Sequence, residues 1–328
     1  MSIDIARSFG VVAIGRNEGE RLKRCLDSAS NAAQVIYVDS GSTDGSLQWA
    51  KQAGVDAIEL DVSVPFTAAR ARNAGFRRLR AIAPDLKFVQ FVDGDCELNK
   101  EWPGTALSFL GSHDQICAVF GRRRELYPER SVYNLICDQE WDVPLGEVKA
   151  CGGDVMIRID ALEAADGYRD DLIAGEEPEL CVRLRAAGWK IWRLDHEMTL
   201  HDAAMLHFSQ WWRRQMRSGH AFAQGAKLHG SPPERHWVWE SRRALIWGLG
   251  FPLSVISAIF VLGWWGALLL LVYPLQIFRR LRSMHGAWLT RLKLAFFEQL
   301  SRYPEAAGEL RFFRDQWLGR HGPLIEYK

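Results

Sequence analysis

The chain has 328 residues, enough for one large domain or two small ones, and 48% of them are hydrophobic. A formal net charge of +1 argues neither for nor against nucleic acid, and we expect no nucleic-acid partner. The six cysteines are scattered without a C-x-x-C pair, which argues against a zinc ribbon or a disulfide framework and suits free thiols in a reducing compartment. The N-terminus has neither a basic start nor a cleavable apolar core, so we expect no secretory signal.

Short apolar runs alternate with helical stretches through residues 9–200. Strands are expected at residues 10–14, 34–38, 56–62, 88–92 and 116–121, and helices at residues 18–29 and 68–82. This alternation predicts an α/β fold with a mostly parallel sheet and helices on both faces. Ligands of such sheets bind outside the carboxyl ends of the strands, so the active face is expected there.

Polar residues gather where three of these strands end. Arg16, Asn17 and Glu18 follow the first strand, residues 39–44 follow the second, and FVQFVDGD places Asp93 and Asp95 after the fourth. Two crowded carboxylates repel one another unless a cation or donors lie between them. The DGD stretch is therefore either a simple turn or a site for a hard divalent cation.

The segment VDSGSTDGS, residues 38–46, joins the second strand to a helix. The Asp39 carboxylate could accept hydrogen bonds from a nucleobase or ribose at such a strand end. The alternative is a helix cap made by Ser42, Thr43 or Asp44. The pairing with DGD some fifty residues later favours the nucleotide interpretation.

These segments together resemble the family 2 glycosyltransferases, inverting enzymes of the GT-A (Rossmann-like) fold. The resemblance runs from about residue 9 to residue 215. Five segments in the family's order carry it: VVAIGRNEGERLKRCLDS (11–28), VDSGSTDGS (38–46), ARARNAG (69–75), FVDGDCEL (91–98) and GEEPELCVRLRAAGWKI (175–191).

The resemblance implies a role for each matching position. Asp93 and Asp95 would form the DxD pair that holds Mg²⁺ or Mn²⁺ against the donor diphosphate, with Asp95 the more direct ligand and His201 a third. The donor nucleotide (UDP-, GDP- or dTDP-linked) would be contacted by Gly15, Arg16, Asn17, Glu18, Asp39, Arg72, Asn73 and Asp93. Gln210, Arg213 and Arg214 loosely resemble the Q-x-x-R-W segment of processive relatives, with tryptophan and arginine inverted, and would contact the diphosphate or the acceptor.

The GEEPEL stretch predicts the catalytic base. Pro178 suits the first turn of a helix and Gly188 can end it, which puts Glu177 at the helix N-terminus, where the dipole favours the ionised carboxylate. By resemblance Glu177 would deprotonate the acceptor hydroxyl, although the family more often has aspartate there. Glu176 is the neighbouring candidate.

Residues 208–227 have helical periodicity. Phe208, Trp211, Trp212 and other apolar side chains share one arc, and three arginines lie opposite. This pattern predicts an interfacial amphipathic helix, with a helix packed on the protein as the alternative.

Residues 244–278 contain no charged side chain. A single helix of that length would measure about 52 Å, against a hydrocarbon core of roughly 30 Å. Arginines flank both ends, which favours a hairpin that enters and leaves a membrane by the cytoplasmic face. Gly263 or Gly266 could form its turn, and both full crossing and a re-entrant hairpin fit. A buried helical pair in a soluble protein is the remaining alternative.

The expected organisation is a GT-A catalytic domain (1–205), an amphipathic interfacial segment (206–240), a membrane hairpin (241–282) and a cytoplasmic tail (283–328). The function expected is inverting, metal-dependent transfer of a sugar to a hydroxyl or phosphate of a lipid-linked acceptor. A dinucleotide oxidoreductase would need G-x-G-x-x-G after the first strand, and GRNEGER is a poor phosphate loop for a nucleotidyltransferase. The alternative from another class is a membrane-anchored scaffold with a non-catalytic domain of this fold.

Overall fold

The computed structural model describes residues 8–61 and 63–319. Three parts of the sequence predictions lie outside the described residues. They are the first residues of the N-terminal segment for which no secretory signal is expected, the end of the predicted strand 56–62, and the end of the predicted tail. The chain forms two compact units. Unit 1 contains the residues up to Glu129 together with Cys137–Ala204, and unit 2 contains Arg130–Ile136 together with the residues from Met205 on.

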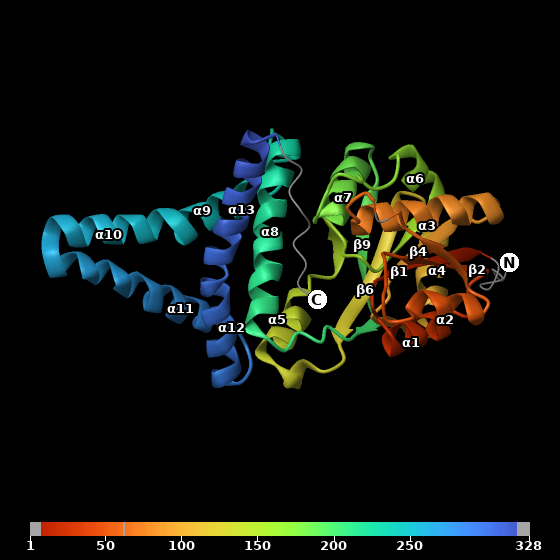
Figure 1. Ribbon diagram of the computed structural model, residues 1–328, viewed down its shortest axis with the longest axis horizontal. Coiled ribbons are helices and arrows are strands. Elements are labelled where there is room, and N and C mark those ends of the chain that lie inside the picture. The colour runs from red at the N-terminus through yellow and green to blue at the C-terminus, as the bar shows by residue number, and fades with distance from the viewer. Residues whose placement is uncertain (1–7, 62, 320–328) are drawn as a thin grey trace. The chain divides into compact units, whose positions relative to one another are not determined.

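A single sheet forms the centre of unit 1, in the order β3-β2-β1-β4-β8-β6-β9-β5, with β7 paired to β9 (Figure 1). Its strands are β1 (Phe9–Gly15), β2 (Gln34–Asp39), β3 (Asp56–Glu59), β4 (Phe88–Asp93), β5 (Cys96–Leu98), β6 (Ile116–Glu125), β7 (Gly146–Val148), β8 (Val155–Arg158) and β9 (Lys190–His201). The strands β1 to β4 are mutually parallel, and β6 and β9 form a second parallel pair. The strand β8 is antiparallel to both β4 and β6 and joins the two groups. The predicted mostly parallel α/β sheet is confirmed.

Helices cover the sheet of unit 1. They are α1 (Glu20–Ser28), α2 (Ser46–Gln52), α3 (Ala68–Ile82), α4 (Trp102–Ser112), α6 (Ile159–Ala164) and α7 (Glu176–Ala186). The central strand β4 is apolar apart from the buried Gln90 and the final Asp93 because both of its faces are covered, and Phe91 is fully buried. Gly75 lets α3 approach β1 closely, since a Cβ there would overlap with Val12. The helix α5 (Val132–Glu140) begins in unit 2 and ends in unit 1.

Unit 2 is helical. Its main helices are α8 (Phe208–His229), α9 (Val238–Leu245), α12 (Trp288–Leu300) and α13 (Arg302–Trp317). Gly219 of α8 and Gly308 of α13 lie at the crossing of these two helices, where any Cβ would overlap with the backbone of the other helix. The two helices therefore pack with their backbones in close approach.

At the centre of the aromatic stripe of α8, Trp211 packs inside unit 2. Trp211 is only 1% exposed and contacts Tyr133 and Phe297 edge to face or stacked. The expectation that this ring lies at a lipid boundary is therefore wrong for Trp211. Periodicity reports which face of a helix is apolar but not what covers that face.

Two helical arms project from the rest of unit 2 as a hairpin (Figure 1). The outgoing arm is η3 (Ile246–Gly250) and α10 (Phe251–Leu262), and the returning arm is η4 (Gly263–Leu271) and α11 (Val272–Ser283). Gly263 makes the turn with φ at 60°, and Gly266 allows the arms to touch, since a Cβ there would overlap with Ala258. Of the two candidates for the turn, Gly263 makes it, and Gly266 instead permits the close contact between the arms.

The segment Val238–Ser283 is long and apolar enough to cross a membrane by length and composition, with a mean hydropathy of 2.4 in its most apolar stretch. Only 11% of that stretch is buried in the protein. At the tip, Phe260 and Trp264 are more than nine-tenths exposed. The described part of the chain therefore leaves a large apolar surface uncovered.

Candidate active site

The loops after β1 and β2 are joined to each other at the carboxyl edge of the sheet. Asn17 donates its backbone N–H to Ser42 Oγ at 2.9 Å and accepts the Thr43 N–H through Oδ1 at 2.7 Å. The conformation of Asn17 is left-handed, with φ at 56°, which asparagine tolerates better than most residues. Residues predicted from two separate motifs thus form one surface.

Asp39 is fully buried at the end of β2. Its carboxylate accepts the Tyr37 hydroxyl at 2.7 Å and the backbone N–H groups of Gly41 and Ser42 at 3.0 and 2.7 Å. Burial and the adjacent Asp39 carboxylate raise the pKa of Tyr37 well above its ordinary value, so its hydroxyl stays a donor. Asp39 therefore organises the loop that follows β2.

Three more of the predicted donor-binding residues surround this loop. The guanidinium group of Arg16 lies over the Phe66 ring, 4.4 Å from its centre, which presents a flat cationic face. Glu18 is buried and lies 2.7 Å from Arg21. Gly15 ends β1, and a Cβ there would lie 3.1 Å from Glu18 Cγ, so the site is tightly packed below Glu18.

Asp93 is held by two arginines. Its Oδ1 lies 3.0 Å from Arg72 Nη2, and its Oδ2 lies 3.0 Å from Arg123 Nη1. Burial alone would raise the pKa of Asp93, but the Arg123 and Arg72 guanidinium groups outweigh it and keep the pKa below its ordinary value. The two carboxylates of the DGD stretch therefore have different partners. The arginine donors on Asp93 reduce the repulsion between them.

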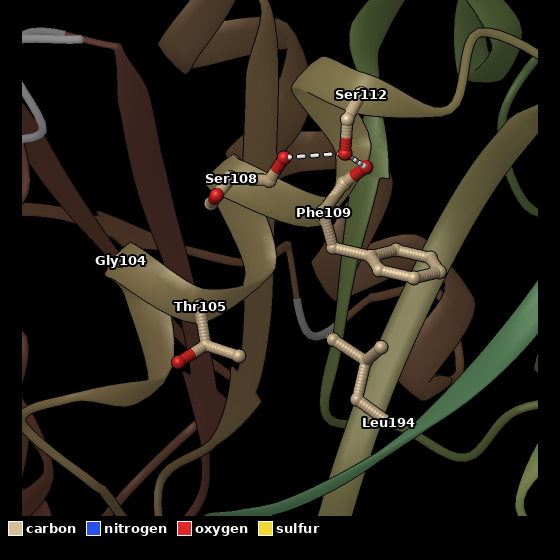
Figure 2. A pocket seen from close by; sticks show the side chains of 6 residues that line it. All are labelled: Gly104, Thr105, Ser108, Phe109, Ser112 and Leu194. Atoms are coloured by element: carbon tan, nitrogen blue, oxygen red, sulfur yellow. Dashed lines mark hydrogen bonds between the residues drawn. The ribbon is translucent and has the colours of Figure 1, made fainter. Parts of the chain in front are cut away.

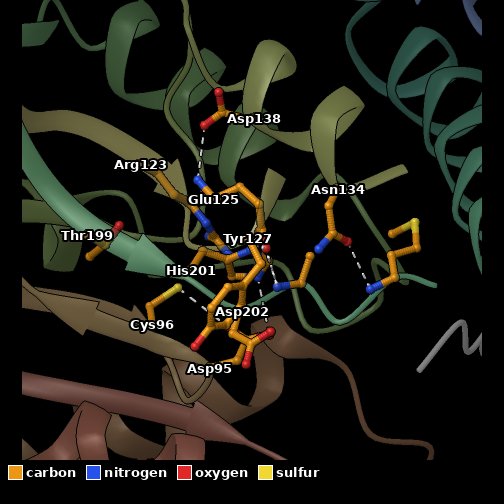
Figure 3. A network of polar contacts seen from close by, with 12 residues as sticks. Asp95, Cys96, Arg123, Glu125, Tyr127, Asn134, Asp138, Thr199, His201 and Asp202 are labelled. Atoms are coloured by element: carbon orange, nitrogen blue, oxygen red, sulfur yellow. Dashed lines mark hydrogen bonds and ion pairs between the residues drawn. The ribbon is translucent and has the colours of Figure 1, made fainter. Parts of the chain in front are cut away.

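Asp95 lies against His201 (Figure 3). The Oδ2 atom of Asp95 is 3.2 Å from His201 Nε2, and both side chains are almost completely buried. Asp95, Cys96 and His201 have ligand atoms within 4.8 Å of one another, and form a group that could hold a metal ion. The structure brings together the predicted ligands Asp95 and His201.

The chemistry of this group fits a divalent cation. A carboxylate oxygen and an imidazole nitrogen that lie 3.2 Å apart interact favourably when a cation or a proton lies between them. Carboxylate oxygen suits both Mn²⁺ and Mg²⁺. Mn²⁺ is the softer of the two ions and accepts an imidazole nitrogen more readily than Mg²⁺ does. Asp95 and His201 are therefore the residues that would hold the ion.

Glu176 and Glu177 begin α7, with Gly175 in the left-handed conformation before them. Nη1 of Arg72 lies 2.8 Å from Glu176 Oε1 and 2.9 Å from Glu177 Oε1. Glu176 is almost completely buried, whereas the Glu177 side chain keeps 14% of its surface exposed. Glu177 is thus the better placed of the two to reach a substrate.

Burial raises the pKa of Glu177 to about 7, and repulsion from Glu176 adds to this against the attraction of Arg72. The sequence predicted a carboxylate kept ionised by the helix dipole. The structure differs, because desolvation outweighs the dipole and leaves a group that changes protonation near neutral pH. A general base works best with a pKa near the working pH.

Two of the other predicted residues have structural partners. Asn73 donates to Tyr168 O and to Asp170 Oδ1, both at 2.7 Å, and accepts the Tyr168 N–H, so its amide is engaged away from the donor loops. Gln210 caps α8 by accepting the N–H groups of Leu206 and His207 at 2.9 Å. Arg213 and Arg214 lie on the same helix in unit 2.

Sequence reasoning missed Arg123, Asp154, Glu125 and Trp141. Asp154 is buried and accepts the Asp93 N–H at 2.9 Å and the Thr199 hydroxyl at 2.8 Å. Arg123 lies over the Trp141 ring at 4.6 Å, and Trp141 in turn contacts His201 edge to face. The one signal available was the run of charged residues directly after the predicted strand 116–121.

A separate hollow of about 520 Å³ lies on α4 (Figure 2). Gly104, Thr105, Ser108, Phe109, Ser112 and Leu194 line it, and none of them belongs to the site above. Its polar side chains carry only hydroxyl groups, and the Ser112 hydroxyl donates hydrogen bonds to carbonyl groups of its own helix. The chemistry-bearing side chains are at the sheet edge instead.

The sheet topology defines a GT-A-like α/β fold, and the paired carboxylates and the glutamates at the start of α7 belong to its candidate site. Residues 11–144 match the model of glycosyl transferase family 2. No curated protein matches the sequence.

Two solved structures show the same fold. One is the mannosyltransferase PcManGT from Pyrobaculum calidifontis in complex with GDP-Man and Mn²⁺, with 16% identity, a TM-score of 0.61, and 92% of this chain and 86% of that chain covered. The other is S. aureus TarS 1–349 in complex with UDP-GlcNAc, with 14% identity, a TM-score of 0.51, and coverage of 95% and 92%. At these identities the likeness shows the fold alone.

Proposed function

We propose that this protein is an inverting, metal-dependent glycosyltransferase that moves a sugar from a nucleotide-sugar donor to a hydroxyl or phosphate of a lipid-linked acceptor at a membrane surface. The observation that carries the proposal is the Arg72 bridge. It joins Asp93, at the expected donor diphosphate, to Glu176 and Glu177 at the start of α7. Donor-binding and proton-accepting groups thus occupy one connected cluster.

Glu177 is the general base of the proposed reaction. Its exposed edge accepts the proton of the acceptor hydroxyl, and the acceptor oxygen attacks C1 of the sugar from the face opposite the leaving group. The configuration at C1 inverts, and a covalent enzyme intermediate is not needed. Glu176, which is buried on Arg72, holds the start of α7 in position.

Asp95 and His201 are the residues that would bind the divalent cation, and Asp93 shares a turn with Asp95. A cation bound there would offset the charge of the donor diphosphate and of the nucleoside diphosphate as it leaves. The similar structure with GDP-Man and Mn²⁺ supports a cation beside the donor, and the similar structure with UDP-GlcNAc supports a nucleotide-sugar donor. Mn²⁺ is our preferred ion, because of the imidazole nitrogen.

The nucleoside would lie on the joined loops after β1 and β2. Arg16, flat against Phe66, offers a face on which a base can stack, and Glu18 and the backbone of residues 40–42 offer polar groups. Asp39 acts through the loop that it holds.

The hairpin would anchor the protein in a lipid bilayer. The uncharged part of the outgoing arm, residues 244–262, is about 28 Å long. The 3₁₀ geometry of η4 lengthens the returning arm, so that residues 263–278 also reach about 28 Å. Both lengths approach the hydrocarbon thickness of about 30 Å, which favours two full crossings. The arginines at the base would place the catalytic domain on the cytoplasmic face.

A calorimetric titration of the detergent-purified chain with UDP, GDP and dTDP, with and without Mn²⁺, tests the function. We expect Mn²⁺-dependent binding of one nucleotide and its loss in the Asp95→Ala variant. Absence of binding by a folded protein would contradict the proposal and would favour the membrane-anchored scaffold.

A further inference from the structure

Three neighbouring strands place Glu125 beside the expected metal site. In the pairing of β9 with β5, His201 lies opposite Cys96, and in the pairing of β9 with β6 it lies opposite Glu125. Asp95 directly precedes Cys96. The backbone register of β5, β9 and β6 therefore sets Asp95, His201 and Glu125 in a row.

The side chains follow the same order (Figure 3). Nδ1 of His201 lies 3.1 Å from Glu125 Oε2, and Nε2 of His201 lies 3.2 Å from Asp95 Oδ2. The Glu125 side chain has no exposed surface. A carboxylate that accepts from Nδ1 favours the neutral tautomer with its proton on Nδ1, which has its lone pair on Nε2.

The Glu125 carboxylate is itself fixed by the backbone. It accepts the Ala203 N–H at 3.2 Å through Oε2 and the Tyr127 N–H at 3.4 Å through Oε1. The ring of Trp141 contacts His201 edge to face, with 4.6 Å between ring centres. These contacts hold the imidazole so that Nε2 points at Asp95.

We propose that Glu125 is a positioning residue that holds His201 with the proton on Nδ1, so that Nε2 and Asp95 Oδ2 together bind a divalent cation. This inference rests on the proposed function and deepens it, because it names the residue that orients the metal ligand His201. Carboxylate partners of metal-binding histidines fix both the tautomer and the orientation of the ring, and their loss weakens metal affinity by about 10–100-fold.

A different structure with the same distances is a doubly protonated imidazole between two carboxylates. In that case Glu125, His201 and Asp95 form a chain of ion pairs that needs no metal. The two arrangements differ in one measurable property, because only the first has a ring nitrogen free to coordinate a metal ion.

The test uses the full chain in detergent and Mn²⁺ alone as the probe. The affinity is measured from the electron paramagnetic resonance signal of free Mn²⁺, and nitrogen coordination from the modulation of the spin echo by the ¹⁴N nucleus. We expect nitrogen coupling in the wild type, its loss in His201→Gln, and a rise of about 10–100-fold in the Mn²⁺ Kd of Glu125→Gln. Glu97→Gln is the matched control, since Glu97 lies on β5 and pairs with exposed Arg24.

The control should bind Mn²⁺ as the wild type does. An unchanged Kd and nitrogen coupling in folded Glu125→Gln would overturn the inference and leave the proposed function intact. Mn²⁺ binding to the wild type without nitrogen coupling would also overturn it. A wild type that binds no Mn²⁺ would contradict the proposed function itself. If Glu125→Gln does not fold, Glu125→Asp, which keeps the charge but withdraws it, is expected to raise the Kd, and an unchanged Kd there would overturn the inference.

Discussion

Arg72 and Glu177 form an ion pair, with 2.9 Å between Nη1 and Oε1, and yet the pKa of Glu177 is raised to about 7. Burial and the neighbouring Glu176 together outweigh the attraction of the arginine. Arg72 divides its guanidinium group among three carboxylates, which include Asp93. One cation shared in this way leaves Glu177 basic enough to accept a proton.

The first prediction concerns Glu177→Gln. We expect kcat to fall by about 10²–10⁴-fold because the base is lost, while Mn²⁺-dependent nucleotide binding stays unchanged. In the wild type, kcat should rise with pH through about 7, since Glu177 must be deprotonated to act. Release of the nucleoside diphosphate, measured between pH 5.5 and 8.5, checks both points.

The matched control for that experiment is Glu163→Gln, an exposed glutamate of α6 that pairs with Arg80. It should keep both the rate and the pH profile of the wild type. Persistence of the pH limb near 7 in Glu177→Gln would show that another group is the base, with Glu176 the next residue to replace.

The second prediction concerns the stability of unit 1. Arg72→Ala leaves the carboxylates of Asp93 and Glu176 without their shared cation, and breaking such a buried pair costs about 3–5 kcal/mol. Arg24→Ala breaks an exposed pair with Glu97 and should cost at most about 1 kcal/mol. Denaturant unfolding followed by circular dichroism measures the two side by side. Equal losses would mean that the Arg72 bridge contributes no more than a surface pair.

The third prediction concerns Glu309, which is fully buried in α13 and bonded to Ser241 at 2.8 Å. Burial raises the pKa of Glu309 to about 8, although the Ser241 hydrogen bond lowers it. The folded-state pKa exceeds the unfolded value of about 4.3. The stabilising contribution is therefore complete below about pH 4.3 and is lost as pH rises through about 8.

We therefore expect the wild-type melting temperature to fall between pH 6 and pH 9 by more than that of Glu309→Gln. Melting curves at several pH values test this, with Glu298→Gln, a partly exposed glutamate of the same unit, as the control. Parallel pH profiles for Glu309→Gln and the wild type would contradict the prediction.

The fourth prediction concerns the hairpin. All six native cysteines are buried, so an introduced thiol can be labelled selectively in proteoliposomes. If both arms cross the bilayer, Trp265→Cys at the tip should react with a membrane-impermeant maleimide only from the side opposite to Ser283→Cys at the base. Ser254→Cys, in the middle of the outgoing arm, should be protected from both sides. A tip thiol that is unreactive from either side would show a re-entrant hairpin.

The sequence predicted those parts of the site that depend on short stretches of neighbouring residues. Polar residues end or follow three of the parallel strands, and the carboxyl ends of parallel strands meet at one edge, so Asn17, Asp39 and Asp93 could be placed together from the sequence alone. Glycine and proline marked the limits of α7 and the turn at Gly263.

The missed residues depend on pairing between distant strands. Arg123 and Glu125 reach the site because β6 carries register shifts where it pairs with β9. Asp154 reaches Asp93 because β8 is inserted antiparallel between β4 and β6. Such register is set by contacts across the sheet and leaves little trace in a short stretch of sequence. The prediction for Trp211 was wrong for a related reason, because the ring that packs against it, Phe297, belongs to a later helix.

The glycines of unit 2 fix more than a close contact. Gly219 and Gly308 each admit the backbone of the opposite helix, and Gly248 at the root of the hairpin admits the backbone of Arg302 in the same α13. A shift of one helical turn would bring a side chain into each of these gaps, so α8, α13 and the hairpin root can move only together. If the hairpin lies in a bilayer as proposed, a tilt imposed by a thicker or thinner bilayer would therefore be transmitted through its root and α13 to α8.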